Sequence, residues 1–120
     1  GGTYEWSLRC REEYLEGIAA NFNKEVVAQH NGHHPEIDVL SDSEATATWY
    51  LHDNFYRLWD KHFVTGTALY RDRYVKEDGR WQILESRYER VYEIDNVMPE
   101  PPPLTAHYLA RHGRARSTPT

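Results

Sequence analysis

The sequence predicts an α+β domain in which a strongly curved antiparallel sheet carries few covering helices. One stretch, residues 9–22, has apolar residues at helical spacing, and the stretches after it alternate like strands. Short connections join the successive strand-like stretches, so neighbours in the chain run antiparallel, as in a meander. The 120 residues allow one domain with a core and are too few for two.

The first elements are a short strand, Thr3–Ser7, and a helix, Arg9–Phe22. Apolar side chains recur every three or four residues along the predicted helix, and acidic side chains take its wet side. The apolar set is Tyr14, Ile18, Ala19 and Phe22, and the acidic set is Glu12, Glu13 and Glu16. Asn21, Asn23 and Lys24 are expected to end the helix.

Five strand-like stretches follow the helix. They are Val26–His30, His34–Leu40, Ala45–Trp59, His62–Lys76 and Arg80–Ile94. Turns are expected at Asn31-Gly32 and at residues 41–43, and Asp78-Gly79 is a strong hairpin signal.

One predicted helix covers little of such a sheet. We expect further cover from a partner subunit, or from residues that this sequence lacks at its front. Residues 1–97 are therefore predicted to form one domain that is incomplete at its N-terminus. Residues 98–120, rich in Pro and then in Arg, Gly, Ser and Thr, are predicted to be a partly disordered tail.

The composition narrows the choice of partners. The net charge is −5 and the basic residues are interleaved with acids, which argues against nucleic acid. The single cysteine, Cys10, allows no internal disulfide and favours a cytoplasmic location. No apolar run is long enough to span a membrane.

The most informative residues are His30 and Asp53. Asp53 lies in a row of alternate residues that is otherwise apolar, and alternate residues of a strand share one face. A carboxylate directed into an apolar interior needs a partner, and we expect a nearby imidazole to supply it. Two other interpretations remain open: a bulge at Asp53-Asn54 would turn Asp53 to water, and, independently, His30 would be a surface or capping histidine.

Other rows suggest a site around this pair. Arg90 lies between two tyrosines in its row, where it would bind Asp53 or an anionic substrate group. A surface cation that stacks on a ring is an equal alternative for Arg90. The residues predicted to line the site are Trp49, Leu51, Phe55, Ala68, Tyr70, Tyr88 and His34. A metal site made of His30, His33, His34 and Asp53 is a weaker alternative, because no metal-binding motif has this spacing. The alternate rows, with Arg71, Arg73, Glu85, Arg87 and Glu89, predict a cross-strand ladder of ion pairs.

Several segments resemble a known family. They are residues 30–37 (His-Asn-Gly-His-His-Pro-Glu-Ile), 45–54 (Ala-Thr-Ala-Thr-Trp-Tyr-Leu-His-Asp-Asn), 70–74 (Tyr-Arg-Asp-Arg-Tyr) and 78–81 (Asp-Gly-Arg-Trp). With them the chain resembles the SnoaL-like branch of the nuclear-transport-factor-2-like superfamily, with the bacterial bile-acid 7α-dehydratase family closest in pattern. The resemblance implies a cone-shaped α+β barrel with a deep apolar pocket, assembled as a dimer or trimer. It also implies catalytic roles for His30, Asp53 and Arg90. The family's front helices, with a tyrosine and an aspartate, have no counterpart in residues 1–29.

These observations predict a lyase that removes water or another small leaving group from an apolar, polycyclic substrate. No metal or organic cofactor is expected, because the activating carbonyl belongs to the substrate. Three other functions stay open: a ligand-binding module without chemistry, an isomerase or polyketide-cyclase-like enzyme, and a dimerising accessory domain that uses the face of Tyr50, Tyr56 and Leu58.

Overall fold

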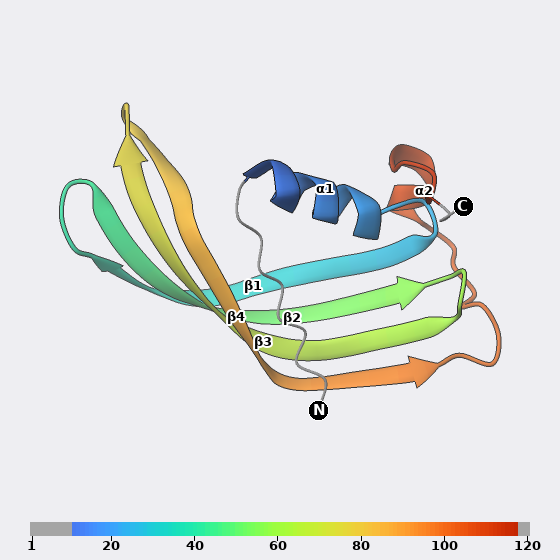
Figure 1. The fold of residues 1–120 in the computed structure, drawn as a ribbon. Helices are drawn as coiled ribbons and strands as arrows, with labels where there is room; N and C mark the ends of the chain where they lie inside the picture. Colours follow the sequence, from blue (N-terminus) through green and yellow to red (C-terminus); the bar gives the residue numbers. More distant parts are fainter. Residues whose placement is uncertain (1–10, 118–120) are drawn as a thin grey trace. The chain divides into compact units, whose positions relative to one another are not determined.

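The computed structural model describes residues 11–117, and these residues form one antiparallel sheet with two helices. The elements in chain order are α1 (Arg11–Asn21), β1 (Val26–Val39), β2 (Glu44–Arg57), β3 (His62–Glu77), β4 (Arg80–Val97) and α2 (Tyr108–His112). The strands are hydrogen-bonded in the order β1-β2-β3-β4, so each strand pairs with its neighbour in the chain (Figure 1). This arrangement confirms the predicted meander. The predicted strand Thr3–Ser7 lies outside the described residues.

The chain divides into two compact units, and each strand contributes a segment to both. The described part of the first unit comprises residues 11–29, 54–64 and 95–117, and the second comprises 30–53 and 65–94. Both helices belong to the first unit. The second unit holds two of the three hairpin turns of the sheet, β1–β2 and β3–β4, and most of the predicted site residues.

In the first unit, Asn23 joins the end of α1 to the start of β1. Its side chain is 1% exposed, donates to the Ala20 carbonyl at 3.2 Å and accepts from the Glu25 amide at 2.9 Å. These bonds satisfy a helix carbonyl that would otherwise lack a partner. The helix α1 therefore ends at Asn21, within the segment where the sequence predicted its end.

Also in the first unit, the segment after β4 packs on β1. His107 Nε2 lies 2.7 Å from the Val26 carbonyl oxygen, and the Lys24 amide donates to the Arg114 carbonyl at 2.7 Å. Arg116 pairs with Glu25 at 2.8 Å and lies over the Trp59 ring. The sequence analysis did not predict α2, because five residues are too few to show a helical period. The boundary at residue 97 and the partial disorder of the tail stay predictions.

In the second unit, β1 runs without a break through the turn that was predicted at Asn31-Gly32. The irregularity falls instead at His34, whose φ of 32° is left-handed. Gly32 approaches the Trp49 ring, whereas Glu36 accepts a hydrogen bond from the Tyr50 hydroxyl, on the opposite face of β2. Gly32 and Glu36 are four residues apart and would share a face in a regular strand, but here they lie on opposite faces. The alternation of side chains is therefore interrupted at His34, as it is at a bulge. Pairing with β2 replaces the predicted turn.

The two hairpin ends of this unit have different turns. Asp78 and Gly79 have φ values of 52° and 77°, which is the pair of left-handed residues that a two-residue hairpin requires. The β1–β2 turn is closed by bonds from the Leu40 and Ser41 amides to the Glu44 carbonyl. Both turns lie where the sequence predicted them.

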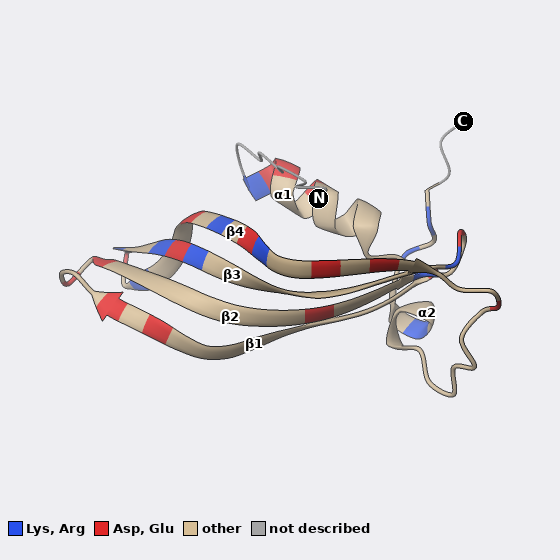
Figure 2. Cartoon of the chain, turned by 90° about the horizontal axis from the view of Figure 1, so that it is seen from below, with Lys and Arg blue, Asp and Glu red and all other residues tan. Residues whose placement is uncertain are grey.

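The two faces of the second unit differ in chemistry. One face has its buried positions at alternate residues, Ala45, Ala47 and Asp53 on β2 and Gly66, Ala68 and Asp72 on β3. We call it the buried face. The opposite face has the predicted ladder, with pairs Arg71–Glu89 at 3.1 Å, Arg73–Glu85 at 3.8 Å and Arg87–Glu85 at 2.6 Å. Figure 2 shows the charged residues of both faces in this part of the sheet as blue and red bands along β3 and β4.

Candidate functional site

A buried ion pair lies at the centre of the buried face. Asp53, on β2, is 3% exposed, and both of its carboxylate oxygens accept hydrogen bonds from Arg90, on β4. Arg90 Nη1 donates to Oδ1, and Nη2 donates to Oδ2 at 3.0 Å. This fork-to-fork geometry is the strongest arrangement of a guanidinium and a carboxylate. The bulge that would have turned Asp53 to water is therefore absent.

Gly66 makes this pair possible. The strand β3 lies between β2 and β4, so Arg90 must cross about two strand spacings, roughly 10 Å, to reach Asp53. A Cβ built on Gly66 would lie 3.1 Å from Arg90 Nη1 and would overlap the Tyr92 carbonyl oxygen. The missing side chain leaves the space in which the guanidinium crosses β3.

The pair also keeps the guanidinium of Arg90 charged. The hydrogen bond to Asp53 raises the pKa of Arg90 above its ordinary value, against the effect of burial, and the charges of Asp53 and Glu93 add to the increase. Glu93 lies 3.4 Å from Arg90 Nη2. From the sequence an imidazole was the first expected partner of Asp53, and Arg90 was expected to bind either Asp53 or an anionic substrate group. In the structure the direct partner of both carboxylate oxygens is Arg90.

His30, on β1, lies close enough to both charges to be affected by them. Partial burial lowers the pKa of its imidazole from 6.5, the negative charge of Asp53 raises it, and the positive charge of Arg90 lowers it again. The net direction is downward, although the residue keeps an exposed surface. A neutral imidazole at neutral pH can accept a proton, which is the property of a general base.

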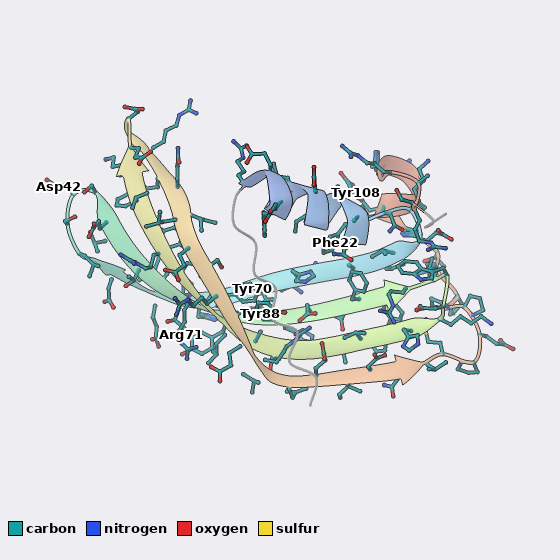
Figure 3. All side chains as sticks on the ribbon, in the orientation of Figure 1. Phe22, Asp42, Tyr70, Arg71, Tyr88 and Tyr108 are labelled. Carbon is teal, nitrogen blue, oxygen red and sulfur yellow. The ribbon has the colours of Figure 1, made fainter. Side chains whose placement is uncertain are left out.

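Aromatic side chains continue the buried face beyond the pair. Tyr70 on β3 stacks on Tyr88 on β4, with ring centroids 5.5 Å apart and planes 21° apart, and Figure 3 shows these two residues side by side. The partly buried Leu51 and the buried Ala68 share this face. His34 is exposed at the change of parity. Phe55 belongs to the first unit, where its ring meets that of Phe22 edge to face.

A chain of hydrogen bonds joins three strands on the same face. Trp49 Nε1 on β2 donates to the hydroxyl of Tyr74 on β3 at 2.9 Å. That hydroxyl donates to Oδ2 of Asp72, also on β3, at 2.7 Å. Ser86 Oγ on β4 donates to the other oxygen of Asp72 at 2.5 Å. Burial raises the pKa of Tyr74, the bond to Asp72 adds to the increase, and the bond from Trp49 opposes it. Tyr74 therefore stays a protonated donor at neutral pH.

Comparison with known proteins identifies the family. A family model described as the SnoaL-like domain matches residues 1–87, which is more than half of the chain. The chain belongs to the SnoaL-like family. The match contains His30 and Asp53, while Arg90 follows three residues after its end.

Two crystal structures share the fold of this SnoaL-like domain. One is a protein from Novosphingobium aromaticivorans DSM 12444 assigned as a scytalone dehydratase, with a TM-score of 0.60 and 21% identity over 79% of this chain and 62% of that chain. The other is a type 2 hexachlorocyclohexane dehydrochlorinase (LinA), with a TM-score of 0.57 and 14% identity over 66% of this chain and 53% of that chain. At these identities the likeness concerns the fold, and it confirms the expected α+β class. The chain spans less than two thirds of both relatives.

The sequence analysis of this SnoaL-like domain missed Asp72, Tyr74 and Ser86. Asp72 follows Gly66, Ala68 and Tyr70 in their row, which is the signal that drew attention to Asp53. The same pattern, a carboxylate in a row of small and aromatic residues, therefore points to both Asp53 and Asp72.

Neither a metal-binding cluster nor a membrane-spanning helix occurs within residues 11–117. No three His, Cys, Asp or Glu side chains of residues 11–117 come together as a metal ion would require. The weaker alternative of a metal site made of His30, His33, His34 and Asp53 is therefore not supported. No helix in the described part of the chain is long and apolar enough to cross a bilayer.

Proposed function

We propose that this SnoaL-like domain belongs to a lyase that eliminates water or another small leaving group from an uncharged, polycyclic substrate. The observation that carries the proposal is the cluster of His30, Asp53 and Arg90 on one face of one unit. It combines a proton acceptor with a fixed pair of charges, and apolar and aromatic side chains extend the face.

In the proposed step, the neutral imidazole of His30 takes a proton from a carbon next to the substrate's carbonyl group. The electron pair of that C–H bond forms a C=C bond, and the leaving group departs with its own electron pair. When the leaving group is hydroxide, the His30 imidazolium returns the proton and water is released. The imidazole is then neutral again, so the catalyst is unchanged.

The Asp53–Arg90 pair supports this step in two ways. The charge of Asp53 stabilises the imidazolium while it exists, which is the direction in which Asp53 acts on the pKa of His30. Arg90, together with Tyr70, orients the oxygen of the substrate. Because Asp53 already neutralises Arg90, the face favours an uncharged substrate over a carboxylate or a phosphate.

The test is proton abstraction, followed with the full-length protein in deuterated water and a panel of polycyclic hydroxyketones. Mass spectrometry reports both deuterium uptake and loss of water. Positioned acid–base catalysis is worth about 10² to 10⁴ in rate, and we expect His30→Gln to lose that factor. The exposed neighbour His33 gives the matched control, His33→Gln, which should retain the rate.

Unchanged turnover in His30→Gln would disprove the role of His30. Deuterium uptake without loss of water would instead indicate an isomerase. Ligand binding without exchange in the wild type, unaltered by His30→Gln, would indicate a binding module without chemistry.

A further inference from the structure

The hydrogen bonds from Trp49 to Ser86 have a fixed direction, because their ends are chemically fixed. An indole nitrogen only donates, and an ionised carboxylate only accepts. Tyr74 therefore accepts from Trp49 and passes its own proton to Asp72. Ser86 also gives its proton to Asp72, at 2.5 Å. The hydroxyl of Ser86 is thus left with lone pairs only.

Ser86 and Asp72 differ in accessibility. Asp72 is 9% exposed, whereas Ser86 is exposed at its position on β4. No Lys, Arg or His within residues 11–117 forms an ion pair with Asp72, so neutral donors alone satisfy its buried carboxylate. The accessible part of this cluster is therefore an acceptor, the Ser86 oxygen, with a carboxylate behind it.

The position of Ser86 relates it to the proposed site. Ser86, Tyr88 and Arg90 are alternate residues of β4, and each contacts a residue of the buried face: Asp72, Tyr70 and Asp53 respectively. At about 3.3 Å per residue, roughly 13 Å of strand separates Ser86 from Arg90. The stacked tyrosines lie between them, and this length suits a steroid-sized skeleton.

We propose that Ser86, oriented by Asp72, is a specificity-determining acceptor for a hydroxyl or phenol group at the end of the ligand remote from His30. The proposal rests on the proposed function only for the choice of this face as the ligand site. It adds a chemical requirement that elimination itself does not impose, namely a hydrogen-bond donor on the far end of the substrate. A methyl ether or a chlorine atom at that end cannot donate, and would leave the Ser86 oxygen without its ligand hydrogen bond.

The test is a pair of rigid tetracyclic probes, equilenin and its methyl ether, whose binding to the full chain is followed by the fluorescence of the probe. The methyl ether carries one methyl group in place of the hydroxyl hydrogen, so its oxygen can no longer donate. One hydrogen bond corresponds to about 3- to 10-fold in affinity, and we expect the wild type to prefer equilenin by that factor. We expect Ser86→Ala to bind the two probes equally. Ser43→Ala, at the exposed β1–β2 turn of the same unit, is the matched control and should keep the preference.

Asp72→Asn tests whether Asp72 orients the Ser86 hydroxyl, because a network with only a structural role would leave the preference between the two probes unchanged. Trp49 still donates to Tyr74, so Tyr74 still needs an acceptor, and the amide oxygen of the asparagine supplies it. The amide nitrogen then faces Ser86, which accepts from it and turns its own proton outward. The oxygens of both probes can accept this proton, so we expect the preference for equilenin to disappear in Asp72→Asn.

Equal binding of the two probes by the wild type, or a preference that survives in Ser86→Ala, would overturn the proposal. So would failure of both probes to bind. If Asp72→Asn does not fold, the exposed Ser86→Ala substitution still decides. Binding is measured without turnover, so a protein that fails the deuterium test but shows the hydroxyl preference would lose the lyase function and keep this subsite.

Discussion

Arg90 reaches Asp53 across an intervening strand, because the residue beneath its guanidinium is Gly66. This relationship joins three strands, β2, β3 and β4, at one point of the buried face. It also gives the row of small residues on β3 a specific role. From the sequence, Ala68 and Tyr70 of this row were predicted to line the site, and in the structure Gly66 of the same row makes room for an ion pair.

Two glycine substitutions test this relationship. Gly66→Ala would place a methyl group against Arg90 Nη1 and the Tyr92 carbonyl oxygen, and β4 or the guanidinium must move. We expect a loss of about 1 to 3 kcal/mol in the free energy of unfolding, measured in urea. Gly32→Ala is the control, because its new carbon would meet the Trp49 ring at an ordinary 3.4 Å. We expect that variant to be neutral or to gain up to about 1 kcal/mol. Equal effects of the two substitutions would show that the space at Gly66 is not needed.

The ion pair itself is tested by removing one partner. Arg90→Met leaves the Asp53 carboxylate buried without its cation, and we expect a loss of about 3 kcal/mol in the free energy of unfolding. The exposed pair of Arg71 and Glu89, with side chains 55% and 70% exposed, provides the comparison. Arg71→Met should cost less than about 1 kcal/mol. Adding Asp53→Leu to Arg90→Met should recover most of the loss, since no buried charge then remains. A double variant as unstable as Arg90→Met would contradict this account.

Alternation along the strands was sufficient to predict which residues share the buried face. Asp53, Ala68, Tyr70 and Arg90 could be placed there because side chains of a strand point to opposite faces in turn. Alternation alone could not decide whether an imidazole or Arg90 is the partner of Asp53. Period two says nothing about which residue of a strand two positions away in the sheet lies opposite, and Arg90 is 37 residues away in the chain.

The two local errors have physical causes of their own. Asn31-Gly32 is a turn signal by composition, but pairing with β2 keeps the strand extended there, and the chain absorbs the mismatch at His34. The short helix α2 depends on contacts of the segment around it, such as that of His107 with the Val26 carbonyl. Neither effect belongs to a local stretch of sequence, so a local pattern does not reveal it.

The segment after α2 offers a test in the first unit. Arg116 pairs with Glu25 and lies 4.7 Å from the centre of the Trp59 ring, which holds the chain where the Arg114 carbonyl accepts from the Lys24 amide. We expect Arg116→Gln to weaken this attachment by up to about 1 kcal/mol and to speed hydrogen exchange of the Lys24 amide about fivefold. The exposed Arg111 gives the control, Arg111→Gln, which should leave that amide unchanged. Equal acceleration by both variants would mean that net charge, and not the Arg116 contacts, holds the segment.

The lowered pKa of His30 makes a prediction about stability against pH. Its folded value lies below the ordinary 6.5, so between these two values the unfolded chain binds more protons than the folded one. The contribution of His30 is therefore complete above pH 6.5 and decreases as the pH falls from 6.5 through its folded pKa. Urea unfolding over this range should show a slope that is smaller in His30→Gln than in the wild type. A nuclear magnetic resonance titration of His30 with a midpoint above 6.5 would contradict the prediction. It would also remove the argument that this imidazole is a neutral base, because burial and Arg90 would then not outweigh the charge of Asp53.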